Sequence, residues 1–414
     1  MFPPAADGLI LLARKMYGGD MKLGSRRTIQ YAVGIMMVGL LGMGLAQGQT
    51  GEPAAAQKPL MSEEAFKNIQ VLRGIPVKEF MGTMGFFAAS LSLNCTDCHV
   101  SESANSWARY ADDTPIKNTA RRMVLMMNNI NKSNFVGARE VTCYTCHRGN
   151  QRPEVTPSLA EQYGTPAPPD PDKVEILSEA ASGPTADQII DKYIQALGGA
   201  QQLAKLTSLV GKGTYEGFDT DFSKMPVEVY AKSPNQLATV VHKPNGDRTT
   251  VFDGRAGWSA APETDVPVPV LPLAEGDLEG ARADAELWFP ANIKQDFTKL
   301  RTGFPATQIN DRDVQVVEGT TPGGSRVKLF FDKQSGLLVR QSRVSNTMVG
   351  LIPMHVEYSD YRTVAGVKVP FHYVTTWTDG QSTTQLTTVQ PNVAIDAAKF
   401  NKPAPPTATK AAAR

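Results

Sequence analysis

The chain has 414 residues, and its 42 Lys and Arg nearly balance 41 Asp and Glu, giving a formal net charge of +1. That length allows two or three domains. A hydrophobic content of 41% and a charged content of 20% are ordinary for globular proteins and argue against wholesale disorder. The near-neutral charge gives no sign of the basic face that nucleic-acid binding requires. Four cysteines are too few for a disulfide-stapled scaffold of this length.

The N-terminal segment has the features of a secretory signal peptide. Basic residues between positions 22 and 27 precede an apolar run over residues 31–45, and a small-residue pattern then ends at Ala46. The run is shorter than the ~20 residues needed to span a bilayer, so cleavage is favoured over a permanent anchor. We therefore expect residues 1–46 to be a signal peptide, Met21 to be the true start, and the mature protein to be exported to the periplasm.

Composition divides the rest of the chain into two regions joined by a proline-rich segment. After a flexible segment at 47–60, residues 61–152 hold all four cysteines and six of the fifteen methionines. Residues 153–185 contain seven prolines, which is typical of a semi-rigid extended linker. Residues 186–402 begin with a short helical pattern and continue with strand-like segments, and the tail at 403–414 is expected to be disordered.

Two copies of one motif carry the chemistry: Cys95–His99 and Cys143–His147 both read Cys-x-x-Cys-His. This run is the attachment signature of c-type haem. Thiols one helical turn apart can form thioether bonds to the haem vinyl groups, and the adjacent histidine is then delivered to the iron. We therefore predict two covalently bound c-type haems. The predicted attachment and proximal ligand residues are Cys95, Cys98, His99, Cys143, Cys146 and His147.

A Cys₄ zinc site is the alternative interpretation, because two Cys-x-x-Cys knuckles are also a zinc pattern. Histidine makes up only 5 of the 414 residues, so its chance placement directly after both knuckles would be rare. A disulfide role would leave the two histidines unexplained. The sequence therefore favours haem over zinc.

A haem iron that shuttles electrons needs a sixth ligand, and a methionine-bearing helical pattern precedes each motif. Residues 77–89 and 116–130 are the predicted helices. Methionine stripes are usually core, because methionine fills gaps well, so the pattern alone leaves ligand and core roles open. The candidates are Met81, Met84, Met123, Met126 and Met127. The histidines beyond the linker are expected to be ordinary surface or core residues: His242, His355 and His372.

Residues 66–149 resemble the cytochrome c subunit of photosynthetic reaction centres. The matching pieces are residues 66–72, Glu79-Phe80-x-x-x-Met84, the first Cys-x-x-Cys-His, Ala120-Arg121-Arg122-Met123 and residues 141–149. In that family a helix carrying the axial methionine precedes each attachment motif. Carried over by position, the resemblance implies Met84 as the sixth ligand of the first haem and Met123 as that of the second. Met81, Met126 and Met127 then become core residues.

The resemblance implies a periplasmic dihaem cytochrome that donates electrons to a photo-oxidised or other membrane redox complex. The chain departs from the family pattern, because that subunit carries four haems and often a lipid-anchor cysteine, whereas this chain has cysteines for two haems. We expect an electron carrier rather than an enzyme. A dihaem peroxidase-type enzyme, which would need an open sixth position on one haem, and a haem-based sensor or binding protein are the alternatives.

The second region has many short strand-like segments and little helix, which predicts an antiparallel β half-barrel. The expected fold is therefore a mainly α dihaem cytochrome module followed by an α+β domain. A hairpin is expected over residues 327–340, and a second strand pair flanks residues 364–366. Phe252-Asp253-Gly254 and residues 366–370 are similar to LolA-like periplasmic lipoprotein-carrier domains. That resemblance implies an apolar concave side for a lipid-like ligand or docking partner. The region shows no nucleophile motif, phosphate loop or metal spacing.

Overall fold

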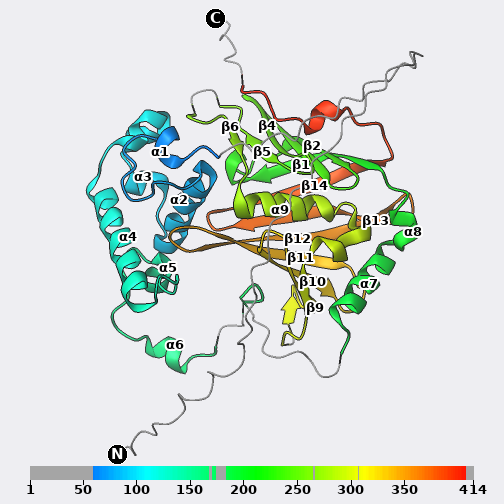
Figure 1. Ribbon diagram of the computed structural model, residues 1–414, viewed down its shortest axis with the longest axis horizontal. Helices are drawn as coiled ribbons and strands as arrows, with labels where there is room; N and C mark the ends of the chain where they lie inside the picture. The colour runs from blue at the N-terminus through cyan, green and yellow to red at the C-terminus, as the bar shows by residue number, and fades with distance from the viewer. Residues whose placement is uncertain (1–58, 167–169, 174–182, 264–265, 306, 407–414) are drawn as a thin grey trace, which may run out of the picture. The chain divides into compact units, whose positions relative to one another are not determined.

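The computed structural model describes residues 59–406, except 167–169, 174–182, 264–265 and residue 306 (Figure 1). The expected signal peptide, nearly all of the segment at 47–60 and most of the tail lie outside the described residues. Within the described part, no helix has both the length and the apolar character needed to cross a membrane.

The N-terminal region, residues 61–152, is built from helices and connecting turns. Both predicted helices are present, as α2 (Val77–Leu91) and α4 (Pro115–Asn134). α4 begins at a favourable cap, because the Thr114 hydroxyl accepts the backbone N–H of Lys117 and a proline occupies the first helical position. The other helices up to residue 163 are α1 (Ser62–Ala65), α3 (Cys95–Cys98), α5 (Cys143–His147), α6 (Leu159–Tyr163), and the 3₁₀ turns Ser101–Asn105 and Trp107–Ala111.

The second region, residues 186–402 (the β region), forms one large antiparallel sheet. Neighbouring strands follow the order β6-β5-β4-β3-β2-β1-β14-β13-β12-β11-β10-β9-β7, with β8 paired to β9, which is an open path in the described residues. The strands are β1 (Ser208–Gly217), β2 (Met225–Lys232), β3 (Gln236–Lys243), β4 (Gly246–Phe252), β5 (Gly257–Ala260), β6 (Val270–Pro272), β7 (Lys299–Arg301), β8 (Thr307–Ile309), β9 (Arg312–Thr320), β10 (Arg326–Asp332), β11 (Leu338–Asn346), β12 (Leu351–Val364), β13 (Val367–Trp377) and β14 (Gly380–Pro391).

Both predicted hairpins are confirmed. β10 pairs with β11, with Phe330 opposite Arg340, and Gly336 supplies the positive φ of 74° that the connecting turn requires. β12 pairs with β13 from Val364 opposite Val367 outward. The hairpin register follows from alternating side chains and short turns, which is why these pairs could be predicted from the sequence.

Helices cover the sheet and fill its core. α7 (Ala186–Leu197) buries Ile190 and Tyr193 in a large hydrophobic cluster with Phe331 and other strand residues. α9 (Glu275–Glu286) contacts β3, β4 and β11 and crosses the sheet (Figure 1). The remaining short elements are α8 (Ala200–Leu203) and the 3₁₀ turns Phe218–Thr220, Pro290–Asp296 and Ala397–Phe400.

A second hydrophobic cluster contains residues of both regions. Leu72 and Phe86 of the N-terminal region pack with Val349, which lies in the turn between β11 and β12. The described residues between 59 and 406 accordingly belong to one compact unit.

Candidate functional site

The first Cys-x-x-Cys-His motif is held in a single capped helical turn. The side-chain oxygen of Asn94 accepts the backbone N–H groups of Thr96 and Asp97 at 3.0 and 3.1 Å. The Asp97 carboxylate accepts the Asn94 N–H in return, at 2.8 Å. This reciprocal cap fixes the short helix Cys95–Cys98 and so places both thiols on one turn.

The second motif has the same local design with different residues. Thr142 caps α5, since its hydroxyl accepts the Thr145 N–H at 3.3 Å and the Thr145 hydroxyl accepts the Thr142 N–H at 3.0 Å. The chain then leaves the helix and the Gly149 N–H donates to the carbonyl of Ser90, at the end of α2, at 3.0 Å. The structure therefore places the second motif directly beside the C-terminal end of α2, which is the methionine-bearing helix predicted before the first motif.

Both motif histidines use Nδ1 in the same way. Nδ1 of His99 lies 3.1 Å from the carbonyl oxygen of Tyr110, and Nδ1 of His147 lies 3.0 Å from that of Asn150. A carbonyl can only accept, so Nδ1 is the protonated donor and Nε2 carries the lone pair. Metal-bound histidines typically have this arrangement, in which the second ring nitrogen is fixed by an outer partner. Burial lowers the pKa of His99, which favours the neutral form that a metal requires.

The four cysteines are free thiols in two separate pairs. Cys95 and Cys146 are exposed, and Cys98 and Cys143 are half-buried. Burial raises the pKa of the Cys143 thiol to about 11. All four lie in the described part of the chain, where no three His, Cys, Asp or Glu side chains are grouped to hold a metal ion. In the described residues the four cysteines are therefore not gathered into one Cys₄ group.

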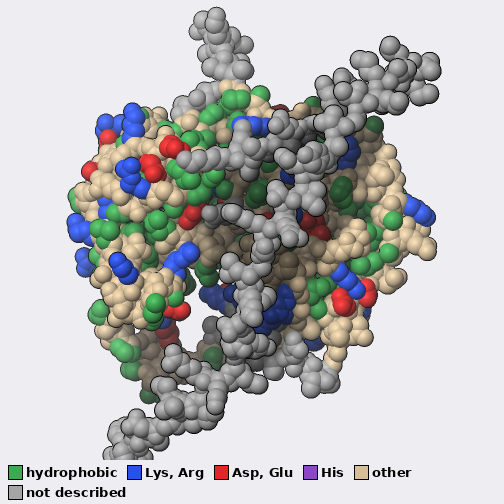
Figure 2. Space-filling view, in the orientation of Figure 1, with side chains coloured by type: hydrophobic (Ala, Val, Ile, Leu, Met, Phe, Trp, Pro, Cys, Tyr) green, Lys and Arg blue, Asp and Glu red, His purple; other side chains and the backbone are tan. Residues whose placement is uncertain are grey.

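The candidate methionines differ in accessibility. Met127 is 4% exposed and belongs to the same hydrophobic cluster as Phe86, which fits its expected core role. Met123, one turn before it, is 38% exposed, and Met84 is half-buried at the edge of that cluster. Met123 therefore has a thioether able to meet a bound group, whereas Met127 does not. The expected core role is wrong for Met81 and Met126, which are 36% and 48% exposed. Figure 2 shows hydrophobic side chains among Lys and Arg over this helical region.

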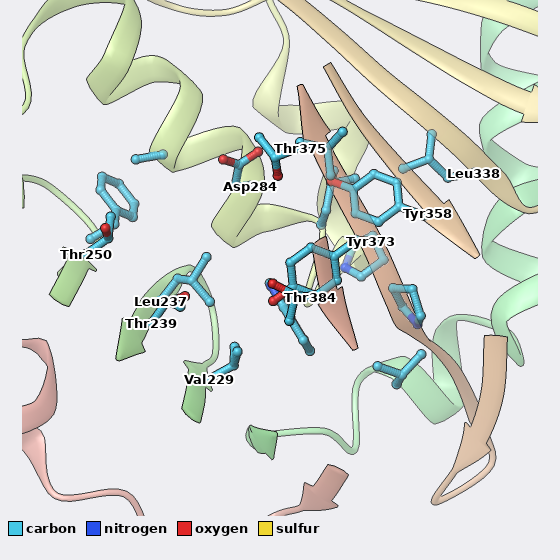
Figure 3. A pocket seen from close by; sticks show the side chains of 18 of the residues that line it. Val229, Leu237, Thr239, Thr250, Asp284, Leu338, Tyr358, Tyr373, Thr375 and Thr384 are labelled. Atoms are coloured by element: carbon cyan, nitrogen blue, oxygen red, sulfur yellow. The ribbon is translucent and has the colours of Figure 1, made fainter. Parts of the chain in front are cut away.

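The β region contains a cavity of about 460 Å³ (Figure 3), which agrees with the apolar concave side expected from the sequence, although its lining residues were not predicted. Side chains from α9 and from strands β2, β3, β4, β11, β12, β13 and β14 converge on it, including Val229, Tyr358 and Tyr373. Its lining is not purely apolar, because Asp284 forms two hydrogen bonds with the buried guanidinium of Arg343, at 2.8 and 3.0 Å. An isolated Arg in an alternating strand and an Asp in a helix give no sequence signal that they will pair.

The three remaining histidines lie outside the two motifs. Nδ1 of His242 lies 2.8 Å from Asp247, that of His372 lies 2.8 Å from Ser359, and that of His355 lies 2.7 Å from Asp172. Each is thus held by a polar neighbour in the β region or the proline-rich segment.

Comparison with known proteins places the likeness in the N-terminal part. Residues 44–172 match the family model described as photosynthetic reaction centre cytochrome C subunit. The photosynthetic reaction center cytochrome c subunit of Thermochromatium tepidum is 37% identical over 106 residues, which covers 25% of this chain and 25% of that protein. Its counterpart from Rubrivivax gelatinosus is 32% identical over 113 residues, which covers 26% of this chain and 29% of that protein. The resemblance inferred from the motifs is confirmed, and the chain spans between a quarter and a third of these relatives' length.

Solved structures were also found to align with about half of the chain. A LolA superfamily protein from Nitrosomonas europaea is 15% identical with a TM-score of 0.37, covering 53% of this chain and 99% of that one. A putative outer membrane lipoprotein-sorting protein domain from Vibrio parahaemolyticus is 11% identical with a TM-score of 0.36, covering 53% and 96%. Both TM-scores are below 0.5.

Proposed function

We propose that this chain is a periplasmic dihaem c-type cytochrome that transfers electrons without substrate turnover of its own. Two hydrogen bonds support this assignment most strongly: Nδ1 of His99 to the Tyr110 carbonyl and Nδ1 of His147 to the Asn150 carbonyl. Each leaves Nε2 to face a metal, and each follows a capped turn with two free thiols. The match of residues 44–172 to a cytochrome family adds independent support.

Each residue has a defined task in the proposed site. A bound c-type haem supplies a one-electron couple at its iron. The thiols of each motif would hold the porphyrin through covalent bonds, and Nε2 of the adjacent histidine would bind the iron. The thioethers of Met84 and Met123 are the proposed sixth ligands, which would raise the reduction potentials above those of bis-histidine haems and close the irons to substrates.

The proposed redox partner is a membrane electron-transfer complex. The two curated relatives are named as subunits of a photosynthetic reaction center, and residues 44–172, which carry both motifs, match the model of that family. A reaction centre or another membrane complex is therefore the class of partner that we propose for the exported protein.

The proposed role of the β region is to bind a lipid-like ligand or a docking partner. Its cavity has the size of a small-molecule site and is lined largely by apolar and aromatic side chains. The Asp284–Arg343 pair adds a polar point to this lining, so an amphipathic molecule fits better than a plain hydrocarbon.

A redox titration with optical and EPR spectra of the purified exported protein tests the haem assignment. Two low-spin haems with a methionine–iron charge-transfer band are expected. A high-spin iron combined with rapid peroxidase turnover would instead favour an enzyme.

A further inference from the structure

Helix α2 carries a stripe of residues that contacts the β region. Glu79, Gly82 and Phe86 follow one another at offsets of three and four residues, so they lie on one side of the helix. At 3.6 residues per turn, Met84 is rotated by about 200° from both Gly82 and Phe86. Met84 therefore lies on the side of the helix opposite to this stripe, and its half-buried side chain packs at the edge of the same hydrophobic cluster as Phe86.

The stripe is covered by the turn of residues 347–350, which joins β11 to β12 in the β region. Val349 is 0% exposed and packs in the same hydrophobic cluster as Phe86. The backbone N–H of Met348 donates to the Glu79 carboxylate at 2.9 Å. An apolar contact at Phe86 and a charge-assisted hydrogen bond at Glu79 thus hold this side of α2 against the turn.

The approach between helix and β region is close enough to depend on glycine. A Cβ atom at Gly82 would lie 2.8 Å from Cδ1 of Ile352, and one at Gly350 would lie 2.4 Å from the Phe86 ring. Glycine is a poor residue for a helix interior, so its presence at position 82 is explained by this close approach.

The turn itself is rigidly built. The N–H and the hydroxyl of Thr347 both donate to the Gly350 carbonyl, at 2.9 and 2.8 Å. The same hydroxyl accepts the N–H groups of Val349 and Gly350, at 3.3 and 3.2 Å. A turn with this many internal hydrogen bonds can hold its neighbour in one place.

We propose that the turn 347–350 is a positioning element of the first haem site. The turn packs against the side of α2 that lies opposite to Met84, so that Met84 is held toward the group attached at Cys95 and Cys98. This inference rests on the proposed cytochrome function, and it gives the β region a part in setting the redox properties of the first haem. Val349 and Gly350 act through the helix and touch no reacting atom.

The test uses the full-length haem protein and a pair of compensating substitutions. Gly82→Ala improves intrinsic helix propensity but places a methyl group 2.8 Å from Cδ1 of Ile352, so that either this side chain or α2 must move. Ile352→Val removes the Cδ1 atom that the new methyl group meets. Gly82→Ala should lower the potential of the first haem, weaken its methionine–iron band and open it to carbon monoxide. The double variant Gly82→Ala/Ile352→Val should reverse all three changes, as expected for residues in direct contact.

Two further variants are needed, one to assign the measured potentials to the two haems and one as a control. Met84→Ala identifies which potential belongs to the first haem, and Asn128→Ala, at an exposed position of α4, is the control that should change neither. An unchanged Gly82→Ala variant, equal changes at both haems, or no recovery in the double variant would overturn the inference. If Gly82→Ala alone fails to fold, recovery in the double variant supports the inference and its absence refutes it. A haem count below two, or normal spectra in Met84→Ala, would count against the proposed function separately.

Discussion

The carboxylate of Asp172 lies 2.7 Å from Nδ1 of His355, which is 183 residues further along the chain. Asp172 belongs to the proline-rich segment, and its second oxygen also accepts from Arg340 at 3.3 Å. The neighbouring Lys173 lies over the Tyr144 ring, within the second Cys-x-x-Cys-His motif, with its Nζ 5.8 Å from the ring centre. At this point the segment is fixed to the sheet on one side and contacts the motif on the other.

Asp172→Ala should therefore destabilise the protein by about 1–3 kcal/mol, because it leaves buried polar partners without their acceptor. Arg340 is only 12% exposed, so water cannot fully replace the lost contact. Asp170→Ala removes an exposed pair with Lys173 and should cost about 0–1 kcal/mol. Denaturant unfolding measures the loss of stability in both variants, and equal losses would contradict this prediction.

The same carboxylate predicts a loss of stability in acid. Burial raises the pKa of Asp172, but hydrogen bonding to His355 and the charge of Arg340 outweigh it and hold the pKa below its ordinary value. A carboxyl with a lowered folded-state pKa stabilises the fold above its unfolded-state pKa and loses that contribution as the pH falls through the folded value. The difference in stability between the wild type and Asp172→Asn should therefore shrink below about pH 4.

Haem stoichiometry is the simplest test of the cytochrome assignment. A pyridine haemochrome assay should give two covalent haems per chain, because each capped turn carries two thiols and one histidine. Replacing Cys95 and Cys98 together by Ala should leave one haem. Stoichiometric zinc in the unmodified protein would contradict the assignment.

Methionine substitutions should separate ligands from core residues. Met84→Ala and Met123→Ala should each remove a methionine–iron charge-transfer band and admit carbon monoxide to one haem. Met127→Ala is the matched control, since this buried side chain should cost about 2–5 kcal/mol of stability without changing the spectra. Normal spectra in the first two variants would move the ligand role to Met81 or Met126.

The sequence identified those parts of the protein that have a local pattern. Both Cys-x-x-Cys-His motifs, the helices before them and the hairpin at Phe330 and Arg340 were predictable from spacing and periodicity. The partners of the motif histidines were not, because a backbone carbonyl such as that of Tyr110 can come from any residue type.

Contacts between segments that lie far apart in the chain could not be predicted from local sequence patterns either. Val349 lies in an apolar turn whose pattern does not indicate that it completes a cluster around Phe86. The stripe on α4 likewise gave no basis for separating Met123 from Met127, since both carry the same side chain within about one turn. Only the packing of α4 shows that one is accessible and the other buried.

Glu286, at the end of α9, predicts that stability falls with rising pH. Burial, assisted by the charge of nearby Asp296, raises the pKa of Glu286 to about 8. Burial also raises the pKa of Asp296 to about 6. Between the unfolded-state and folded-state values, the folded protein binds more protons than the unfolded chain, so the free energy of unfolding decreases as the pH rises.

Glu286→Gln should remove part of this pH dependence, because the amide resembles the protonated carboxyl and does not ionise. The wild type should lose stability between about pH 5 and 8 with a contribution from Glu286 of at most about 1.4 kcal/mol per pH unit, reduced by partial solvent access. The variant should therefore be more stable than the wild type at pH 8 and similar to it at pH 5. Denaturant unfolding across this range measures the difference, with the exposed Glu161→Gln as control. A parallel pH profile for wild type and Glu286→Gln would show that this carboxyl ionises freely in the folded protein.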